Sequence, residues 1–453
     1  MPELPLTLYR AAWVLPVCAE PIRNGAVLVG TDGRIAAVGP ATAIEPPEGC
    51  VVDDLGEAAL LPGLVNVHAH PELAMFRGAL EDLCFRDWIL RLVGAKRAVL
   101  TDADFHAAAR WTMVEALRSG ITTIAATESS GAAAGALCEA GLRGVVYQEV
   151  FGPDPAQRDE AMAGLRANVE CLRAFECDRV KIGVSPHAPY TVSDALFTAA
   201  AEYAVAERLP MAVHAAESAI EHQLVQAGEG DFAPGLRARG IETPPRGRTT
   251  VEMLDRLGVL RARPLLIHCV LLDADDIRRV GDTGSTVAHC PVANARLGHG
   301  LAPYPEMVSA NVRVGLGTDS VGSNNRLDLL EEARVASIMH RARLARCDVL
   351  GPAELLRLCT IDGARALGLE DQAGTLEPGK EADLCAVSLA APHVRPVHDP
   401  VAAVFHAARG CDVVMTAVQG RILYRDGRLA TLDPAALEPA VEDAARRLRE
   451  ALT

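Results

Sequence analysis

The middle of the chain alternates short apolar runs with longer segments in which apolar residues recur at helical spacing. Such helical spacing is present over 105–118, 195–207 and 329–345. Eight apolar runs separate the helical segments, at 64–67, 121–125, 145–150, 180–184, 211–213, 265–267, 286–288 and 312–316. Eight strands alternating with helices over roughly 300 residues predict an α/β fold of the (β/α)8 TIM-barrel type, although an open doubly wound sheet would give a similar pattern.

Both ends of the chain have a different pattern, in which short β-like runs are separated by glycine turns. The runs are 26–29 and 35–38 near the start, and 382–387, 413–418 and 422–424 near the end. We expect 1–60 and 374–432 to form one small β-sandwich domain, with the barrel over 61–373 inserted between its halves. The last segment, 433–453, is expected to form a helix capped by Asp433, with Pro434 just inside it.

Composition narrows the class of protein. The 453 residues include 44 Lys and Arg against 59 Asp and Glu, a net charge of −15, which argues against a nucleic-acid partner. Twelve cysteines are spread from Cys18 to Cys411 with no CxxC pair, as is typical of a reducing compartment. No convincing N-terminal signal or apolar run of about 18 residues is present, so we expect a cytoplasmic enzyme without a membrane span.

Polar side chains stand at or just after the ends of six different apolar runs: His68, His187, His214, His268, His289 and Asp319. In a (β/α)8 barrel the carboxyl ends of the strands carry the chemistry, so these side chains are expected to share one site. His68 and His70 form an HxH pair, and residues i and i+2 of a strand point to the same side. Alone, such a pair is more often a satisfied polar pair than a metal site.

With His214 and Asp319 added, three imidazoles and one carboxylate can converge on a single divalent cation. Zinc suits this set best, and iron and manganese are left open. A water bound to such an ion can ionise near neutral pH and act as the nucleophile.

The lysines bear on how many metal ions the site holds. Binuclear sites of this kind bridge two metals with a carboxylated lysine on a mid-barrel strand, and this chain has only Lys96, Lys181 and Lys380. Lys96 lies in a helical stretch, Lys380 in the C-terminal small domain, and Lys181 near the start of its run. We therefore predict a mononuclear site.

Several motifs follow one another in a characteristic order: LPGLVN (61–66), HAH (68–70), SPHAPYTVS (185–193), HAAES (214–218), HCVLLDADD (268–276), HCPVANARLGHG (289–300), GTDSVGSNN (317–325) and GTLEPGKEADL (374–384). In this order they resemble the amidohydrolase superfamily, in its cytosine deaminase, adenosylhomocysteine deaminase and chlorohydrolase branch. The resemblance covers nearly the whole chain. It implies that His68, His70, His214 and Asp319 bind the metal, that Glu217 is a proton shuttle, and that His268 adjoins the metal-bound water and the departing group.

Chemical requirements agree with these roles. Hydrolytic removal of an amine from a ring carbon needs a hydroxide, a base, and an acid that protonates first the ring nitrogen and then the amine. Asp319 can act as the base, and Glu217 lies three residues beyond His214, within reach of the same site. The alternatives are that Glu217 only faces a helix N-terminus and that His268 is a satisfied core histidine.

Candidate substrate contacts are His187, Trp88 and His289. His187 is the preferred contact, whereas His289 is either a pocket residue or a hydrogen-bonded support. Trp88 could stack on a flat ring or belong to the core. Glu72 and Arg77 could reach the pocket or lie on the surface, and the histidines outside the motifs are interpreted as structural or solvated: His106, His222, His340, His393, His398 and His406.

The predicted function is mononuclear metal-dependent hydrolytic deamination of an aminated purine-type heterocycle or nucleoside, in which a metal hydroxide attacks the ring carbon and ammonia leaves. Within the branch, the segment 68–93, YQEVFG (147–152) and LGHG (297–300) resemble aminodeoxyfutalosine deaminases. Adenosine and adenosylhomocysteine deaminases carry a ribose-binding glutamate near the position of Arg97 and an arginine near Gln148 and Glu149. This difference argues against recognition of ribose or homocysteine in their manner.

Three alternative functions remain. A triazine-type chlorohydrolase or aminohydrolase would use the same attack, but Glu217 favours departure of an amine, because chloride needs no proton. Hydrolysis of a cyclic amide is disfavoured by the shortage of lysines, and a non-catalytic ligand-binding barrel by the full set of site residues. The resemblance also implies a homodimer or a higher homo-oligomer.

Overall fold

The computed structural model describes residues 4–452. Residues 1–3 of the expected small domain and Thr453 of the expected terminal helix lie outside the described residues. All eight predicted apolar runs are strands, and they form two four-stranded parallel sheets. The first sheet contains β6 (Leu64–Ala69), β7 (Ile121–Glu128), β8 (Arg143–Val150) and β9 (Val180–Pro186); the second contains β10 (Ala212–Ala215), β11 (Leu265–His268), β12 (Thr286–His289) and β13 (Arg313–Leu316).

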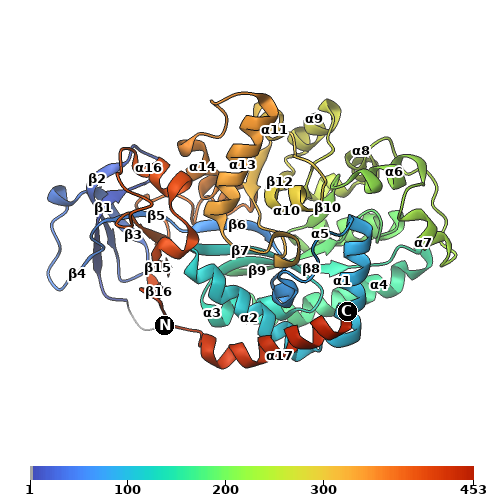
Figure 1. Ribbon diagram of the computed structural model, residues 1–453, viewed down its shortest axis with the longest axis horizontal. Coiled ribbons are helices and arrows are strands. Elements are labelled where there is room, and N and C mark those ends of the chain that lie inside the picture. The colour runs from blue at the N-terminus through green and yellow to red at the C-terminus, as the bar shows by residue number, and fades with distance from the viewer. Residues whose placement is uncertain (1–3, 453) are drawn as a thin grey trace.

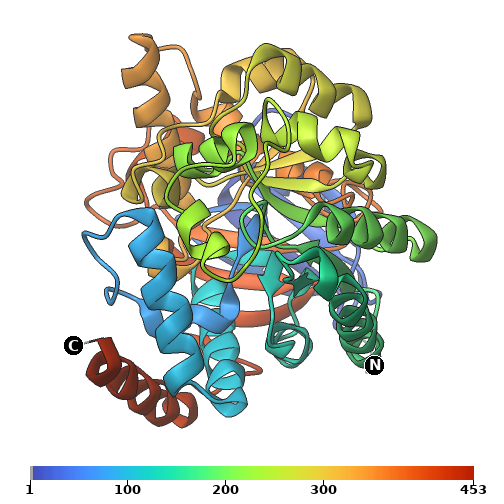
Figure 2. The ribbon, with the colours of Figure 1, turned by 90° about the vertical axis from the view of Figure 1, so that its right-hand side faces the viewer.

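The edges of the two parallel sheets meet at two places. An isolated parallel bridge joins Val184 of β9 to Met211, and another joins Ala69 of β6 to Asp319. The helices surround the strands of both sheets (Figure 2). The carboxyl ends of β6, β10, β11 and β13 are thereby oriented alike, which places the residues that follow them at one end of the assembly.

Seventeen α-helices are present among residues 4–452: α1 (Phe85–Val99), α2 (Asp102–Arg118), α3 (Ala132–Ala140), α4 (Arg158–Leu172), α5 (Asp194–Glu207), α6 (Ala219–Ala227), α7 (Ala233–Arg237), α8 (Thr250–Arg256), α9 (Ala274–Thr283), α10 (Pro291–Arg296), α11 (Tyr304–Ser309), α12 (Val321–Asn324), α13 (Leu329–Leu344), α14 (Pro352–Leu358), α15 (Ile361–Ala366), α16 (Pro400–Ala402) and α17 (Pro434–Leu452). Short 3-10 turns lie at Ala41–Ala43, Pro71–Phe76, Pro155–Gln157, Arg173–Phe175, Val259–Ala262 and Gly410–Asp412, and a π-helical turn at Ala403–Ala407. No helix in the described part of the chain is both long and apolar enough to cross a membrane.

Strands from both ends of the chain share a third, nine-stranded sheet, at the left of Figure 1. It contains β1 (Thr7–Val14), β2 (Ile22–Val29), β3 (Ile35–Pro40), β4 (Val51–Asp54), β5 (Ala58–Pro62), β14 (Leu384–Ser388), β15 (Val413–Val418), β16 (Arg421–Arg425) and β17 (Arg428–Leu429). The strand order is β17-β16-β15-β14-β5-β1-β2-β3, with β4 paired to β1. The antiparallel pair β5 and β14 therefore joins the two ends of the chain.

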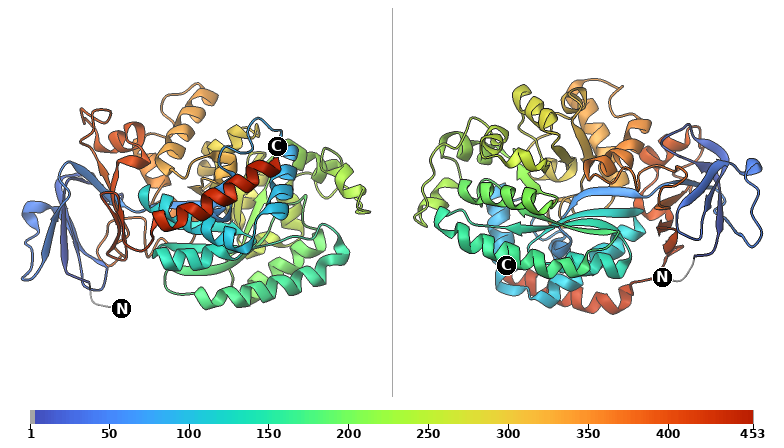
Figure 3. Two further views of the ribbon diagram at one scale, coloured as in Figure 1. Left: turned by 60° about the horizontal axis from the view of Figure 1, so that its bottom comes forward. Right: turned by 180° about the vertical axis from the view of Figure 1, so that it is seen from behind.

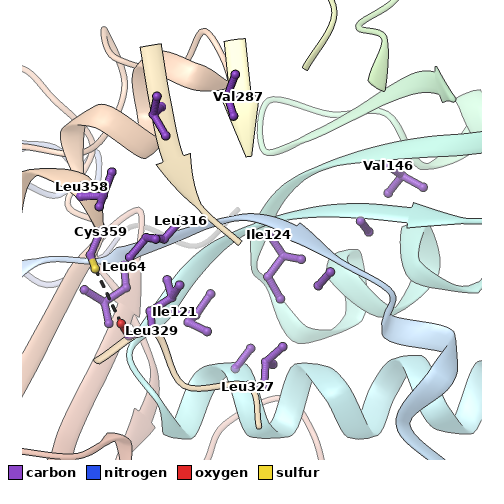
Figure 4. Packing of buried hydrophobic residues seen from close by; sticks show 14 of the residues in the cluster. Leu64, Ile121, Ile124, Val146, Val287, Leu316, Leu327, Leu329, Leu358 and Cys359 are labelled. Atoms are coloured by element: carbon purple, nitrogen blue, oxygen red, sulfur yellow. Dashed lines mark hydrogen bonds between the residues drawn. The ribbon is translucent and has the colours of Figure 1, made fainter. Parts of the chain in front are cut away.

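The strands of the first parallel sheet are buried almost throughout, since β6, β7 and β8 have no exposed residue. Strands covered on both faces are continuous apolar runs, which explains why the sequence pattern located them. Figure 4 shows Leu64, Ile121 and Ile124 packed with Leu316 and Leu358 in this core. Beside them the Cys359 thiol lies 3.7 Å from the Leu329 carbonyl oxygen.

One buried arginine connects the first parallel sheet to the nine-stranded sheet. Arg143 begins β8, and its guanidinium is about 1% exposed. Its Nε donates to Asp383 at 2.9 Å, Nη1 donates to Gln372 at 2.9 Å, and Nη2 contacts Glu381. These partners lie just before β14, so Arg143 fixes the nine-stranded sheet against β8 by charged hydrogen bonds.

The terminal helix α17 crosses α1 and α2 (Figure 3, left). Arg447 of α17 donates to Asp104 at 2.6 Å and to the Val99 carbonyl oxygen at 2.6 Å. Asp104 also caps α2 together with Thr101. At the start of α17, Asp433 accepts a hydrogen bond from the Ala435 N–H at 3.0 Å.

Candidate active site

Three histidines and one aspartate from the ends of three strands converge. His68 lies near the end of β6, His70 follows that strand directly, and His214 lies on β10. Each of the three offers a ring nitrogen, and these nitrogens all lie within 4.8 Å of one another. Asp319 follows β13, with its Oδ1 3.3 Å from Nε2 of His68 and 3.5 Å from Nε2 of His70. The structure thus brings together the four residues that the sequence predicts as metal ligands.

The donor atoms of this cluster fit a divalent cation. Nε2 of His68 is buried and has no hydrogen-bond partner among residues 4–452. The far ring nitrogens are occupied: Nδ1 of His68 lies 3.2 Å from Thr127 Oγ1, and Nδ1 of His214 lies 3.2 Å from the His187 carbonyl oxygen. Contacts of this kind orient the other nitrogen of a metal-binding imidazole.

The protonation states of these side chains also suit a metal. Burial lowers the pKa of His68 and His214, and it lowers the pKa of His70 to about 3, so all three imidazoles are neutral at pH 7. Burial alone would raise the pKa of Asp319, but the neighbouring histidines hold it well below its ordinary value. Neutral imidazoles and an ionised carboxylate are the forms that bind Zn²⁺, Fe²⁺ or Mn²⁺.

The backbone is strained where the site is built. His268 has φ +76° and Asp319 has φ +59°, in the left-handed region that non-glycine residues rarely adopt. Such conformations cost about 1–3 kcal/mol each and persist where surrounding contacts hold them. Around Asp319 the Ser320 N–H donates to Oδ1 at 2.7 Å and the Ser323 hydroxyl donates to Oδ2 at 2.8 Å. These bonds fix the direction of the carboxylate.

The Glu217 side chain faces the same cluster from the loop before α6. Its Oε1 lies 3.5 Å from Nε2 of His268 and 3.4 Å from Nε2 of His299, and the Tyr190 hydroxyl lies 3.5 Å from Oε2. Burial would raise the pKa of Glu217, but His268 and His299 keep it below its ordinary value. The side chain is 5% exposed and points at two imidazoles, which distinguishes it from a solvated helix-start carboxylate.

His268 is held by Asn294, whose Oδ1 lies 2.9 Å from Nδ1 of the ring. Its other nitrogen therefore faces Glu217, and its ring centroid lies 5.5 Å from that of His214. His299 was not predicted as a site residue. It lies in the LGHG motif, beyond α10, and its ring packs against Phe85 with the centroids 4.4 Å apart.

The three predicted substrate contacts have different surroundings. His187 lies in the site, with its ring centroid 4.7 Å from that of His214. Trp88 is buried on α1, packs against Phe85 and donates its indole N–H to the Gly322 carbonyl oxygen at 3.2 Å. His289 is fully buried, and its Nε2 lies 3.2 Å from Nε2 of His340 on α13, which favours a supporting position.

The lysines lie away from any bridging position between the predicted ligands. Lys181 is exposed near the start of β9. Lys96 does reach the carboxyl ends of the strands, which its helical position did not predict, but its ammonium contacts Glu72 and lies 2.9 Å from Ser129 Oγ. Glu72 is buried and also accepts the Ser130 N–H at 2.9 Å, whereas Arg77 pairs with Glu115 in a partly exposed position.

A second trio, Glu149, His187 and His214, also has ligand-type atoms within 4.8 Å of one another. It shares His214 with the first trio, and Nδ1 of His214 faces the His187 carbonyl oxygen. Only Nε2 of His214 is left to bind a cation. The two trios therefore cannot both use His214 at the same time.

Comparison with known proteins agrees with this geometry. The model of the amidohydrolase family matches residues 59–423. The chain belongs to the amidohydrolase family. Amidohydrolases of this kind have an α/β fold of the TIM-barrel type, which the likeness to a solved structure below also supports.

Among this amidohydrolase's relatives, a 5-methylthioadenosine/S-adenosylhomocysteine deaminase from Moorella thermoacetica is 34% identical over 430 residues, covering 94% of this chain and 96% of the relative. The structure resembles an adenosine deaminase from Xanthomonas campestris with bound zinc, at a TM-score of 0.87 and 28% identity, covering 99% of this chain and 100% of that one. An aminofutalosine deaminase from Helicobacter pylori shares the fold at a TM-score of 0.80 and 20% identity, covering 92% of this chain and 99% of that one.

Proposed function

We propose that this amidohydrolase is a mononuclear, metal-dependent hydrolytic deaminase of an aminated purine-type nucleoside or heterocycle. The observation that carries the proposal is the placement of the Glu217 carboxylate, 3.5 Å from His268 beside the cluster of His68, His70, His214 and Asp319. A deaminase needs a proton carrier at this point, whereas a site that only binds a ligand does not. The names of the relatives support the same reaction.

His68, His70, His214 and Asp319 would hold one divalent ion. Zinc is the first choice because it is bound in the Xanthomonas campestris relative, and iron and manganese suit the same donors. When bound, such an ion supplies a Lewis acid that makes water a better nucleophile near neutral pH.

The protein's own residues carry the protons. Asp319 takes a proton from the attacking water as the water oxygen bonds to the ring carbon that bears the amine. Glu217, which is ionised in the free site, takes the other proton of the water and delivers it to the ring nitrogen. Asp319 then passes its proton to the amine, so that the carbon–nitrogen bond breaks and ammonia leaves. His268, fixed by Asn294, holds Glu217 and the departing group in place. A chloride would leave without a proton, so Glu217 supports an aminohydrolase over a chlorohydrolase.

At the other end of the substrate we place His187 as a direct contact and Trp88 as a wall of the pocket, with His289 as a support. Arg97 stands near the position where related deaminases carry a ribose-binding glutamate, and its side chain is exposed. The motifs at 147–152 and 297–300 keep aminodeoxyfutalosine among the candidate substrates.

We further propose that β6–β13 close into one barrel over 61–373, which the two isolated bridges between the parallel sheets support. The strands of 1–60 and 374–432 would then form a small β-sandwich domain, and 433–453 a helix that docks on the barrel. We expect a cytoplasmic protein that forms a homodimer or a higher homo-oligomer. The mass of the purified protein in solution tests the oligomeric state.

The decisive experiment is an ammonia-release screen of the zinc-loaded protein. The panel contains adenosine, 5-methylthioadenosine, S-adenosylhomocysteine, aminodeoxyfutalosine, guanine, cytosine and amino- and chlorotriazines, with metal-stripped protein as the control. Release of ammonia from a purine nucleoside by the loaded protein alone is expected. Chloride release from a triazine without ammonia release from any purine would overturn the proposal.

A further inference from the structure

Glu221 is a buried carboxylate that the proposed reaction does not use. It lies in the first turn of α6, and its side chain is fully buried. No cation among residues 4–452 forms an ion pair with it. A buried carboxylate without a paired cation is stable only where hydrogen bonds replace the lost water. The hydrogen-bond partners of Glu221 therefore indicate what this residue does.

Both oxygens of Glu221 accept hydrogen bonds from the loop that carries Glu217. Oε1 accepts the Ala216 N–H at 2.8 Å, and Oε2 accepts the Glu217 N–H at 3.1 Å. The hydroxyl of Thr250, the first residue of α8, donates to Oε1 at 2.5 Å. The described part of the chain offers these two N–H groups no other acceptor. Glu221 is therefore the partner of the backbone at the proposed shuttle residue.

The backbone that Glu221 holds is strained. Only residues 216–218 connect β10 to α6, and Ala216 has φ +53°, in the left-handed region. Such a conformation persists where surrounding contacts hold it. The Ala216 carbonyl oxygen accepts the Leu271 N–H at 2.9 Å, from the segment that follows β11. The peptide group between Ala216 and Glu217 is thus fixed on both sides, its C=O by Leu271 and its N–H by Glu221.

The orientation of this peptide group decides where the Glu217 carboxylate lies. Oε1 of Glu217 is 3.5 Å from Nε2 of His268 and 3.4 Å from Nε2 of His299. A rotation of the preceding peptide group would swing the side chain away from both rings. In an enzyme site a displacement of about 1 Å can lower the rate about 100-fold. The hydrogen bonds of Glu221 therefore act on the reaction through the position of Glu217.

We propose that Glu221 is a positioning residue for the shuttle, and that Glu221 and Thr250 together hold the backbone at Glu217 so that its carboxylate faces His268. This inference rests on the proposed function, because it presumes that Glu217 transfers the proton. It also gives α8 a part in the reaction, through the hydroxyl of Thr250.

The first test replaces Glu221 by glutamine. The amide of Glu221→Gln has one acceptor oxygen and one NH2 donor, so one of the two backbone N–H groups loses its acceptor. At pH 8, above the pKa of about 7 to which burial raises Glu221, kcat per metal-loaded molecule should fall about 10- to 100-fold. KM should change much less, and the metal content should stay at the wild-type value.

Threonine variants provide the matched comparison. Thr250→Val removes the hydroxyl that supports Glu221 and should lower kcat about 2- to 10-fold, whereas Thr250→Ser keeps the hydroxyl and should retain the wild-type kcat. Thr416→Val is the control. Thr416 is also buried, and its hydroxyl donates to the Leu117 carbonyl oxygen at 2.7 Å in the nine-stranded sheet, so this variant should lower stability without lowering kcat.

A double variant shows whether Glu221 acts through the shuttle. Glu221→Gln should lower kcat strongly in the wild-type background and little further in a Glu217→Gln background, because the carboxylate that Glu221 positions is already absent there. Losses that multiply in the double variant would overturn the inference.

The remaining outcomes separate this inference from the proposed function. If the wild type releases ammonia and Glu217→Gln does not, but Glu221→Gln has the wild-type kcat and only a lower melting temperature, the inference is wrong and the proposed function stands. If the wild type releases ammonia from no compound of the panel, both fail. Should Glu221→Gln not fold, equal kcat values in Thr250→Val and the wild type would overturn the inference.

Discussion

Nε2 of His299 lies 3.4 Å from Oε1 of Glu217, the same oxygen that faces His268 at 3.5 Å. A single carboxylate oxygen is thus held between two imidazoles that come from different segments, one at the end of β11 and one beyond α10. A carboxylate fixed in this way needs no rearrangement before it transfers a proton, which is the kind of preorganisation that catalysis requires.

Replacing the shuttle should separate chemistry from metal binding. We expect Glu217→Gln to keep its metal and its fold while turnover falls by roughly 10²- to 10⁴-fold, the usual contribution of a positioned acid–base group. Ammonia release and metal content, measured on the same preparation, test this. Glu229→Gln, exposed just beyond α6, is the matched control. Near-normal ammonia release by Glu217→Gln would remove Glu217 from the role of shuttle.

Replacing His299 should leave the Glu217 carboxylate less firmly positioned while substrate binding is retained. We expect His299→Asn to lower kcat about 10-fold, because the Glu217 carboxylate loses the imidazole that lies 3.4 Å from it, while KM changes much less. His398→Asn changes an exposed histidine and should leave both constants unchanged. A rise in KM at constant kcat would instead show that His299 binds substrate.

Metal removal should abolish activity and also lower the thermal stability of the protein. Stability falls because the neutral imidazoles of the site are buried and lose the ion that they bind. Elemental analysis of the purified enzyme should give about one ion per chain, as expected of a site with four protein ligands and an open position. Activity should return when zinc is added to the stripped protein. Two tightly bound ions per chain would contradict the mononuclear site.

The ion pair between Arg447 and Asp104 should make the docking of α17 sensitive to acid. Burial alone would raise the pKa of Asp104, but the hydrogen bonds from Arg447 and Thr101 lower it below the value of about 3.9 in the unfolded chain. The pair therefore stabilises the fold fully above that unfolded value, and the stabilisation is lost as the pH falls through the depressed pKa.

Arg447→Met should consequently cost about 1 kcal/mol at pH 7, the upper range for a partly exposed pair. The difference in unfolding free energy from the wild type should shrink as the pH falls below about 4, where Asp104 becomes protonated in the unfolded chain. Urea unfolding of both proteins at a series of pH values tests this. A difference that grows towards low pH would contradict the assignment.

The buried arginine predicts a large effect on stability and a small one on chemistry. Arg143→Met leaves Asp383 buried without its cation and Glu381 with only Arg34 at 3.6 Å, and breaking such a network typically costs about 3–5 kcal/mol. Thermal unfolding should show the loss, while kcat per folded molecule stays near the wild-type value. Arg239→Met, at an exposed position, should change neither quantity. An unchanged melting temperature in Arg143→Met would show that the nine-stranded sheet is held by other contacts.

The sequence located the strands and the metal cluster for a common physical reason. Strands buried on both faces must be apolar throughout, so all eight runs were visible, and β6 and β10 carried His68 and His214 to their carboxyl ends. In a (β/α)8 barrel the carboxyl ends of all strands lie at one end of the barrel. The sequence positions of His68 and His214 therefore predict that the two histidines lie close together, although the sequence does not reveal how the strands pack.

The residues that were missed reach the site through packing that no local pattern encodes. Lys96 lies on α1, whose docking over the strand ends brings the ammonium to Glu72 and Ser129. His299 follows α10 in a loop, and only its place in the LGHG motif could have suggested a role. Glu149 was noted as a difference from relatives, but its burial and the missing partner of Oε1 are visible only in three dimensions.

The pairing of β5 with β14 also has a consequence for synthesis on the ribosome. β5 ends at Pro62, and its partner β14 begins at Leu384, so more than two thirds of the chain is made between the two. Until β14 emerges, β5 presents an open edge whose apolar residues Ala58–Pro62 are fully buried in the finished protein. The nascent enzyme must therefore protect this edge while the eight parallel strands assemble, and the N-terminal sheet is completed only after all eight of them have been made.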